Sequence, residues 1–320
     1  MREDAVDSVL GAIGHTPLVA LDRMREREKV GPRVFAKLEY YSPGGSIKDR
    51  VAIKIIEEAE KKGLLTRGQP IVELTSGNMG IGLAVACAIK GYGFTAVMSK
   101  GNTPERWKIL KAFGADVVLV PQAKGGIPGS VSREDLELVE KRTQELVRRR
   151  RAFRPDQFVN PDNPGAHEEG TGEEIWSQTR GGLGYFVAMV GTGGTFVGIA
   201  RALKRHDPSI ACYAVEPKSA PVLAGRPITS TKHKLQGGGY AFVPSQWDPK
   251  LCDGFLAVSD AEAVSYARML ARAEGVLSGF SGGANVAAAF RLAKRVGGHR
   301  SVVTVIPDTG LKYLSTDLFE

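Results

Sequence analysis

Short apolar segments alternate with amphipathic or small-residue segments along most of the chain. The apolar segments that we predict to be strands are 70–75, 95–99, 116–120, 185–190 and 211–216. The segments that we predict to be helices end near Lys90 or cover 104–113 and 196–205. Strands that are apolar throughout and alternate with helices are typical of a mostly parallel sheet covered on both faces. We therefore expect an α/β protein with two runs of strands and helices.

A polar region separates the two runs. It begins with a segment rich in glycine and proline, 121–132, and continues with a basic helix, 133–151. The next segment, 154–164, contains three prolines, which disfavour regular structure because proline lacks a backbone N–H. We expect this segment to cross between two lobes. Ligands of such folds bind beyond the carboxyl ends of the strands, which predicts a site in the cleft between the lobes.

The composition is that of an ordinary globular protein. The chain has 320 residues, of which 42% are hydrophobic and 24% are charged, and this length fits roughly two domains of about 150 residues. Its longest apolar stretches reach about half of the ~20 residues that span a bilayer, and the N-terminus lacks an apolar signal core. We expect no membrane partner and a cytoplasmic location.

The net charge of +8 raises the question whether the chain binds nucleic acid. The densest basic cluster, 148–151, ends a predicted helix whose first turn carries Glu134 and Asp135. Acidic residues at the start of a helix and basic residues at its end complement the helix dipole. Neither interleaved aromatic residues nor zinc-finger spacing accompanies the cluster. We therefore interpret it as a solvated helix end and expect no nucleic-acid partner.

Cysteine and histidine spacing predicts neither a disulfide framework nor a metal site. The three cysteines, Cys87, Cys212 and Cys252, lie far apart, are odd in number and form no C-x-x-C pair. The five histidines have no metal-ligand spacing. This usage fits a reducing compartment, in agreement with a cytoplasmic protein.

Lys48 is the first candidate for chemistry. It lies in the segment Pro43–Arg50, which opens a predicted helix that runs to Lys62. Ser46 and Asp49 resemble a capping box, which predicts that Lys48 lies in the first helical turn. The positive end of the helix dipole favours the neutral amine, which is the nucleophilic and basic form of a lysine. An ordinary exposed lysine is the alternative.

Two turns that contain glycine are candidates for anion binding. Thr75–Gly80 joins a strand to a helix, so its backbone amides and hydroxyls form a turn suited to a carboxylate or phenolate. A plain tight connection is the alternative there. Gly191–Thr195 also joins a strand to a helix, which predicts a phosphate cup. A dinucleotide fingerprint would need glycine in place of Phe196, and Glu216 lies beyond the usual ~20 residues.

Ser281 offers a competing interpretation as a hydrolase. It lies in Gly279–Gly283, which matches the G-x-S-x-G nucleophile elbow. A hydrolase of that type needs a later acidic residue and then a histidine. His299 is the one histidine that follows, and Asp308 comes after it rather than before. The order of residues therefore disfavours a hydrolase.

Seven segments, in order along nearly the whole chain, resemble those of one family. This is the cysteine synthase family, the β-family of pyridoxal-phosphate enzymes, which also includes cystathionine β-synthase. The matching segments are Gly14–Leu18, Pro43–Arg50, Thr75–Gly80, Asn160–Pro164, Gly191–Thr195, Gly279–Ala284 and Pro307–Thr316. Each segment alone is a weak signal, but the ordered set is specific. The resemblance implies fold type II, with pyridoxal 5'-phosphate in the cleft between two α/β lobes, each a mostly parallel twisted sheet flanked by helices.

The resemblance also bears on domains and assembly. We expect a smaller, mobile N-terminal α/β domain at 41–156. We expect 1–40 and 157–320 to form a larger α/β domain that carries the cofactor phosphate cup. A homodimer is the assembly that the family implies.

The resemblance gives each matched residue a role. Lys48 would form a Schiff base with the cofactor aldehyde and, once displaced by substrate, would remove the α-proton. The residues expected to bind the cofactor are Lys48, Asn78 at the phenolic oxygen, Thr309 at the pyridine nitrogen, and the phosphate cup of Gly191, Thr192, Gly193, Gly194 and Thr195. The residues expected to bind the substrate are Thr75, Ser76, Asn78, Met79 and Gln157.

The implied reaction is β-replacement on a β-substituted L-serine through an α-aminoacrylate, with a sulfur or amine nucleophile as the second partner. A hydroxyl at Thr309 cannot keep the ring nitrogen protonated as a carboxylate would, which favours replacement at Cβ over transamination. O-acetylserine plus sulfide, the cysteine synthase reaction, is the expected pair. Serine plus homocysteine, and phosphoserine plus an amine as in diaminopropionate synthesis, stay open. Outside this class, a nicotinamide-dependent oxidoreductase is the alternative.

Two features depart from the usual pattern of the family. Family members usually have threonine where this chain has Met79, so one hydrogen bond to the substrate would be missing. Gly237–Tyr240 resembles the loop of cystathionine β-synthase more than that of the sulfhydrylases. The reaction class is therefore better defined by the sequence than the substrates are.

Overall fold

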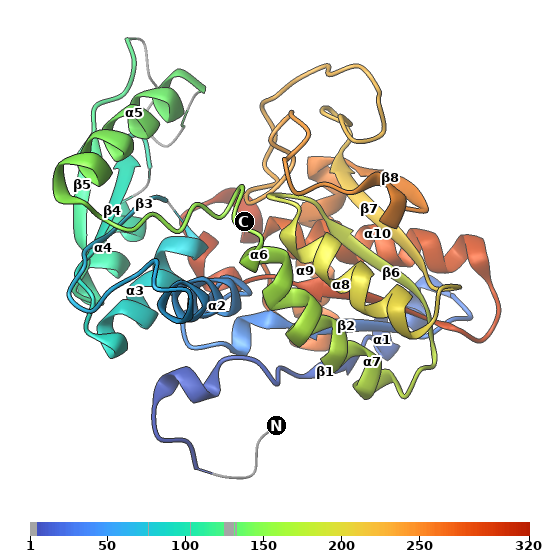
Figure 1. Ribbon diagram of the computed structural model, residues 1–320. Helices are drawn as coiled ribbons and strands as arrows, with labels where there is room; N and C mark the ends of the chain where they lie inside the picture. Colours follow the sequence, from blue (N-terminus) through green and yellow to red (C-terminus); the bar gives the residue numbers. More distant parts are fainter. Residues whose placement is uncertain (1–4, 76, 103, 125–130, 132) are drawn as a thin grey trace.

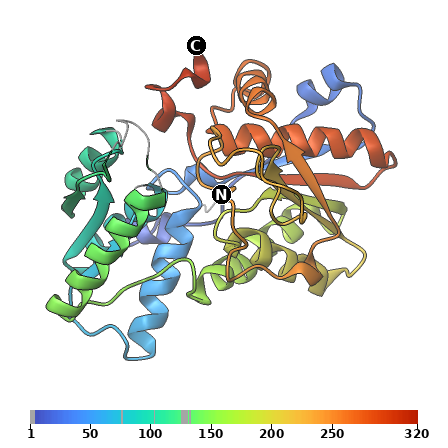
Figure 2. The same ribbon diagram turned by 90° about the horizontal axis from the view of Figure 1, so that it is seen from above.

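The computed structural model describes residues 5–75, 77–102, 104–124, 131 and 133–320 (Figure 1). Its strands form two sheets, one in each of two lobes that lie side by side (Figure 2). The larger sheet has the order β1(Leu18–Ala20), β2(Val34–Leu38), β9(Ser301–Ile306), β6(Leu183–Met189), β7(Ala211–Pro217) and β8(Gly254–Val258). The smaller sheet has the order β3(Ile71–Leu74), β4(Phe94–Ser99) and β5(Asp116–Val120). Neighbouring strands are parallel except for the antiparallel pair β1 and β2.

Helices cover both faces of each sheet (Figure 1). Those of the smaller lobe are α2(Lys48–Lys61), α3(Asn78–Lys90), α4(Pro104–Ala112) and α5(Arg133–Arg150). Those of the larger lobe are α1(Asp22–Glu28), α6(Asp162–Ala166), α7(Glu173–Thr179), α8(Gly194–His206), α9(Asp260–Glu274) and α10(Phe280–Val296). A π-helical turn, His167–Gly172, joins α6 to α7, and short 3₁₀ turns lie at Val9–Ala12, Glu39–Tyr41, Pro249–Leu251, Gly310–Tyr313 and Asp317–Phe319.

The predicted α/β fold with mostly parallel sheets is confirmed. Each of the five predicted strands is present, with bounds that differ from the prediction by two residues at most. The predicted capping box is wrong. The helix α2 begins at Lys48, the Ser46 hydroxyl accepts the Lys48 N–H at 3.3 Å, and the Asp49 carboxylate accepts the N–H of Gly44 instead. Lys48 nevertheless lies in the first turn, as expected.

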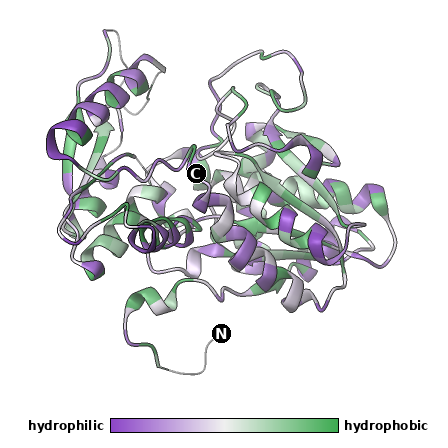
Figure 3. Ribbon diagram, viewed as in Figure 1, coloured by the Kyte–Doolittle hydropathy of each residue, from purple (hydrophilic) through white to green (hydrophobic). Residues whose placement is uncertain are grey.

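The two faces of the larger sheet are buried in separate cores. Along β6, Val187 and Met189 face the core that includes α9 and α10, whereas Phe186 and Ala188 face the core that includes α8. Successive side chains of a strand point to opposite faces, so a strand buried on both faces must be apolar throughout. Figure 3 shows this pattern, with largely hydrophobic strands in the larger lobe and a mostly hydrophilic α5 on the outside of the smaller lobe.

The proposed domain boundaries agree with the sheet order but stay a prediction, as does the mobility of the smaller domain. All three strands of the smaller sheet lie within 41–156, and all six strands of the larger sheet lie outside it. The crossing segment 154–160 is irregular, but the helix α6 begins at Asp162 and so includes the last residues of the predicted irregular segment. Just before the crossing, Phe153 forms a bridge with Ile71 at the edge of the smaller sheet.

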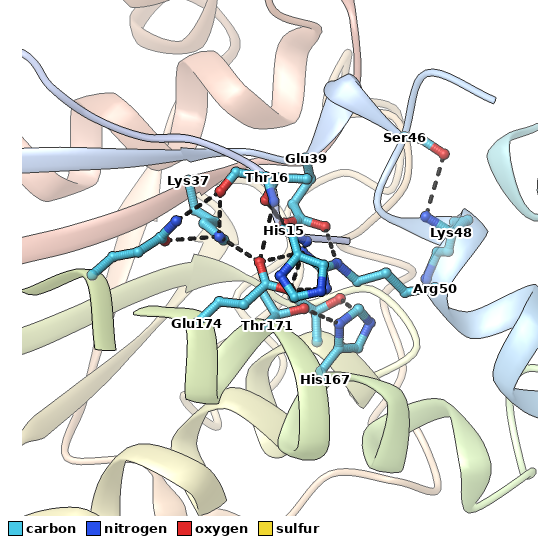
Figure 4. Close-up of polar contacts among 12 residues, drawn as sticks. His15, Thr16, Lys37, Glu39, Ser46, Lys48, Arg50, His167, Thr171 and Glu174 are labelled. Atoms are coloured by element: carbon cyan, nitrogen blue, oxygen red, sulfur yellow. Dashed lines mark hydrogen bonds and ion pairs between the residues drawn. The ribbon is translucent and has the colours of Figure 1, made fainter. Parts of the chain in front are cut away.

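Buried ion pairs join the first turn of α2 to the larger lobe (Figure 4). The Arg50 guanidinium donates to Glu39 Oε2 and to Glu174 Oε1, each at 2.6 Å. Lys37 Nζ donates to the other Glu174 oxygen at 2.6 Å, and the Thr16 hydroxyl donates to Glu39 Oε1 at 2.6 Å. These contacts link α2 to β2, α7 and the N-terminal segment. The position of α2 is therefore set from three directions.

Burial opposes the charged forms of the side chains in this network, and the ion pairs favour them. The side chains of Lys37 and Glu39 are fully buried, and that of Arg50 is 6% exposed. Burial alone would raise the pKa of Glu174, but its hydrogen bonds and proximity to Arg50 and Lys37 outweigh burial and lower this pKa to about 2. Burial works against the charge of Arg50 as well, and its two carboxylate partners reverse this and raise its pKa. Glu174 and Arg50 are therefore charged at neutral pH, whereas for Lys37 burial outweighs the neighbouring carboxylates and lowers the pKa.

Replacement of Arg50 with methionine is expected to lower the free energy of unfolding by about 3–5 kcal/mol, because two carboxylates would lose their buried cation. The measurement is denaturant unfolding followed by circular dichroism. Arg201→Met is the matched control, since its side chain is 44% exposed and its nearest carboxylate, on Glu168, is 3.9 Å away. Equal effects of the two substitutions would contradict a structural role of the buried network.

Candidate active site

The segment before Lys48 pairs with the segment near the C-terminus, which lies at the junction of the two lobes (Figure 2). The Ile47 N–H donates to the Pro307 carbonyl at 2.8 Å, and the Thr309 N–H donates to the Gly45 carbonyl at 3.3 Å. A Cβ on Gly45 would lie 3.4 Å from the Thr309 side chain, and Gly45 has a φ of +70°. This pairing brings Lys48 and Thr309, 261 positions apart in the sequence, into one site.

Lys48 is the first residue of α2 and its side chain is only partly exposed. Burial lowers the pKa of its ammonium to about 8, because the charged form is poorly solvated there. The helix dipole acts in the same direction at this end of the helix. A substantial fraction of the amine is therefore neutral near physiological pH. Such an amine can attack a carbonyl carbon or accept a proton from a carbon acid.

The turn Thr75–Gly80 follows β3 and leads into α3, as expected. Thr75 is buried and its N–H donates to the Val97 carbonyl at 3.1 Å, while Asn78 is the first residue of α3. Gly80 has to be glycine, because a Cβ there would lie 2.6 Å from the Thr75 side chain. Ser76 lies outside the described residues. The turn thus places Thr75 and Asn78 at the carboxyl end of the smaller sheet, facing the larger lobe.

Asn78 contacts the C-terminal segment directly. Its amide donates to Asp308 Oδ2 at 2.7 Å and its carbonyl oxygen accepts from Lys312 Nζ at 2.8 Å. The Tyr313 hydroxyl donates to the same Asp308 oxygen at 2.6 Å. Asn78 therefore binds the same C-terminal segment that pairs with the residues before Lys48.

Met79 has a different environment from its neighbour. Its side chain is 3% exposed and belongs to the apolar cluster of the smaller lobe that α2 and α3 share. The contact of Met79 with a substrate stays a prediction. In this conformation the residue contributes to the core beneath the turn.

The predicted phosphate cup lies between β6 and α8. The helix α8 begins at Gly194, so the N–H groups of its first turn have no acceptor within the helix and are free to bind an anion. A Cβ on Gly191 would lie 2.3 Å from the Gly237 carbonyl oxygen, and one on Gly194 would lie 2.1 Å from Asn163 Oδ1. Gly193 has a φ of +95°, which disfavours any other residue. The chain therefore forms a close-fitting cup that only glycine permits.

Two hydroxyls of the cup, those of Thr192 and Thr195, each contact a side chain outside the cup. The Asn163 amide donates to Thr192 Oγ1 at 3.0 Å, and the Thr195 hydroxyl contacts His167 Nε2 at 3.2 Å. The other ring nitrogen of His167 contacts the Thr171 hydroxyl at 3.0 Å (Figure 4). Burial, together with Lys48 and Arg50, keeps the pKa of His167 well below its usual value. This histidine is therefore neutral and orients the cup without adding charge.

Gln157 and Thr309 are the remaining predicted site residues. The Thr309 hydroxyl oxygen accepts the Leu311 N–H at 3.2 Å, which leaves the hydroxyl hydrogen available as a donor. The Oε1 atom of Gln157 is buried and has no hydrogen-bond partner within the described part of the chain. A buried acceptor without a partner is costly, so this atom is suited to a ligand.

Comparison with known proteins identifies the class. Residues 9–308 match the family described as "Pyridoxal-phosphate dependent enzyme". The chain belongs to this family, and it is therefore a pyridoxal-phosphate-dependent enzyme. The family match leaves no support for the nicotinamide-dependent alternative.

Particular relatives narrow the class. The chain is 41% identical to a cysteine synthase of Staphylococcus aureus (strain N315), over 100% of this chain and 99% of that one. It is similar to the crystal structure of O-acetyl serine sulfhydrylase isoform 3 from Entamoeba histolytica, with a TM-score of 0.91 and 35% identity, over 100% of this chain and 93% of that one. It is also similar to the crystal structure of O-ureido-L-serine synthase, with a TM-score of 0.89 and 38% identity, over 99% and 96%. The predicted resemblance to the cysteine synthase family is confirmed.

The residues present fit pyridoxal 5'-phosphate. The glycine turn leaves the N–H groups at the start of α8 available to a phosphate, and Lys48 supplies a reactive amine. Within the described ranges, the Thr309 hydroxyl hydrogen and the Gln157 Oε1 atom have no partner. Among the described residues, no group of three or more His, Cys, Asp or Glu side chains is arranged to hold a metal ion. None of the helices in the described ranges is long and apolar enough to span a membrane.

Sequence reasoning missed Arg50, His167 and Lys312 as parts of the site. Each contacts residues far away in the sequence, which periodicity and turn motifs do not report. One signal was available for the network of Arg50. Lys37 is a charged residue within the otherwise apolar strand β2, and a buried lysine requires a buried partner.

The low pKa of Lys48 predicts how fast the cofactor-free protein reacts with pyridoxal phosphate. The rate should rise about tenfold per pH unit and level off above about pH 8, because only the neutral amine reacts. The measurement is the growth of violet absorbance after mixing, with a blocked lysine amide as the control. A rate that keeps rising to about pH 10, near the pKa of an ordinary lysine, would contradict the shift.

Proposed function

We propose that this enzyme catalyses β-replacement on a β-substituted L-serine, with O-acetylserine and sulfide as its substrates, as in cysteine synthase. The observation that carries the proposal is the pairing of Gly45 with Thr309, which brings a hydroxyl side chain to the segment that leads to Lys48. A hydroxyl at the ring nitrogen leaves the cofactor a weaker electron sink than a carboxylate would, which suits loss of a group from Cβ. The 41% identity to a cysteine synthase supports the same reaction.

The other site residues are proposed to bind the cofactor or the amino-acid substrate. Bound pyridoxal phosphate supplies an electron sink for the carbanion at Cα. We propose that Lys48 holds the cofactor and then moves the α-proton, that Asn78 contacts the phenolic oxygen and that Thr309 contacts the ring nitrogen. Gly191, Thr192, Gly193, Gly194 and Thr195 are proposed to hold the phosphate. Thr75, Ser76, Asn78, Met79 and Gln157 are proposed to bind the amino-acid substrate. The free Oε1 of Gln157 is suited to its ammonium group, and the turn amides to its carboxylate.

An aromatic patch beside the cup favours a second candidate, a thiol with a side chain such as homocysteine. The patch consists of Phe158, Tyr240 and Phe242, and Tyr240 stacks on Phe242 with ring centroids 5.8 Å apart. Tyr240 and Phe242 are 41% and 51% exposed. Phe158 directly follows Gln157, and Tyr240 directly follows Gly237–Gly239, which lies against the cup. An apolar surface next to the site would suit a nucleophile larger than sulfide.

We also propose a homodimer in the cytoplasm. The dimer rests on the resemblance to the family. The compartment rests on the cysteines, because Cys87, Cys212 and Cys252 are all free thiols, and Cys87 and Cys212 are buried. Free thiols without a disulfide are usual in a reducing compartment.

The proposed reaction predicts the outcome of a matrix of donors and nucleophiles. O-acetylserine, O-phosphoserine and serine are each combined with sulfide, homocysteine and an amine, and product formation gives second-order rate constants. The highest constant is expected for O-acetylserine with sulfide, and borohydride reduction should label Lys48 in peptide mapping. Lys48→Ala should abolish turnover, whereas Lys54→Ala, on the same helix, should not.

The other possible results of this matrix either favour the second candidate or refute part of the proposal. A higher constant with homocysteine than with sulfide would favour the second candidate. Label on another lysine would refute the role of Lys48, and absence of product from every pair with cofactor bound would refute the proposed reaction.

Met79→Thr is expected to improve the use of O-acetylserine relative to its best rival. Residue 79 lies in the core in this conformation, so the gain requires the turn to bring it toward the substrate. A hydroxyl in that position would add one hydrogen bond to a charged group, worth about 1.5–3 kcal/mol, or roughly ten- to a hundred-fold in affinity. The measurement is the ratio of the two second-order rate constants. Met98→Thr is the control, because Met98 is 1% exposed in the same apolar cluster and its loss tests packing alone. An unchanged ratio would mean that Met79 does not set specificity.

A further inference from the structure

We propose that Lys312 and Asp308 are positioning residues that hold the Asn78 amide as a hydrogen-bond donor toward the phenolic oxygen of the cofactor. The inference rests on the proposed placement of that oxygen at Asn78. Asn78 comes from α3, Asp308 and Lys312 come from the segment 307–313, and each of the two lies within hydrogen-bond distance of Asn78. None of the roles given above for the cofactor or the substrate involves Lys312.

The charges of the two neighbours fix the orientation of the amide. Lys312 can only donate, and an ionised Asp308 can only accept. Asn78 Oδ1 therefore lies toward Lys312 at 2.8 Å, and its Nδ2 lies toward Asp308 at 2.7 Å. A flipped amide would set NH₂ against the ammonium and oxygen against the carboxylate, and both contacts would be repulsive. One amide hydrogen is used by Asp308, which leaves the second one to donate.

Lys312 has no donor left for a substrate. An ammonium has three hydrogens, and Lys312 Nζ has three acceptors, the carbonyl oxygens of Gly44 at 2.9 Å and Gly45 at 3.2 Å and the Asn78 side chain. Gly44 and Gly45 belong to the segment that leads to Lys48. Lys312 therefore links the segment before Lys48 to Asn78 on the other side of the cleft, and its role is to position both.

Asp308 is held in its acceptor role by a second donor. The Tyr313 hydroxyl donates to Asp308 Oδ2, and the pKa of Tyr313 is raised well above its usual value by burial, by the charge of Asp308 and by the hydrogen bond to it. Asp308 is 1% exposed, and burial raises its pKa, while the hydrogen bonds from Tyr313 and Asn78 and the charge of Lys312 act in the opposite direction and favour the ionised acceptor. Arg106 and Asp49 are the other charged groups that act on this cluster.

The test is the absorption spectrum of the cofactor-loaded enzyme. An amide that donates to the phenolic oxygen favours its ionised form, which gives the violet band. Lys312→Met removes the cation and lets the amide flip, so intensity should move from the violet to a near-ultraviolet band. The expected change in the ratio of the two bands is about tenfold, since one hydrogen bond to a charged group is lost. Spectra are normalised to the cofactor released by alkali.

Further variants separate this inference from its alternatives. Lys312→Arg should keep the violet band, and Asp308→Asn should shift it in the same direction as Lys312→Met. Lys294→Met, an exposed lysine paired with Glu28, is the matched control and should change nothing. Full cofactor content with an unchanged spectrum in both Lys312→Met and Asp308→Asn would overturn the inference. A wild-type protein without a violet band would instead refute the cofactor placement, so the two failures are distinguishable.

Discussion

The buried ion pairs of Arg50 are the interaction on which the position of Lys48 depends. Arg50 lies two residues after Lys48 on α2, and it binds Glu39 and Glu174 of the larger lobe at 2.6 Å. The apolar face of the same helix packs in the core of the smaller lobe. The helix thus belongs to one core and is bonded to the other lobe. A buried pair contributes little to net stability, but it penalises every arrangement in which a partner is missing.

The C-terminal segment applies a second constraint to the same helix from the opposite side. The segment that leads into α2 is held by backbone pairing of Gly45 and Ile47 with 307–309 and by two hydrogen bonds from Lys312. The amine of Lys48 is therefore fixed from both sides. The C-terminal segment holds the residues before it, and the ion pairs of Arg50 hold the residues after it. A catalytic group keeps its position more precisely when the residues around it are held by packing and by hydrogen bonds. The glycine cup is held in the same manner, by Asn163 and His167 behind its hydroxyls.

Local features of the structure could be predicted from the sequence, and long-range contacts could not. The strands around 95–99 and 116–120, the first-turn position of Lys48 and the place of Gly191–Thr195 between a strand and a helix depend on residues close together in the sequence. The capping box failed because Asp49 binds Gly44 in a loop that the C-terminal segment shapes. Arg50 and Glu174 lie 124 positions apart, and Asn78 and Lys312 lie 234 apart. No periodicity reports such pairs, since only the folded topology brings them together.

The electrostatic consequence of these contacts reaches Lys48 itself. Two cations bind near the start of the same helix, and each has its own partners: Arg50 binds two carboxylates, and Lys312 binds carbonyl oxygens and lies near Asp308. His167 is kept neutral. Among the described residues no ion pair joins Lys48 to a carboxylate, and burial lowers its pKa to about 8, in the direction that the helix dipole also favours. A carboxylate paired with Lys48 would hold the ammonium form and remove the nucleophile. The acidic residues of this region bind the neighbouring cations, and that arrangement leaves the amine of Lys48 free to react.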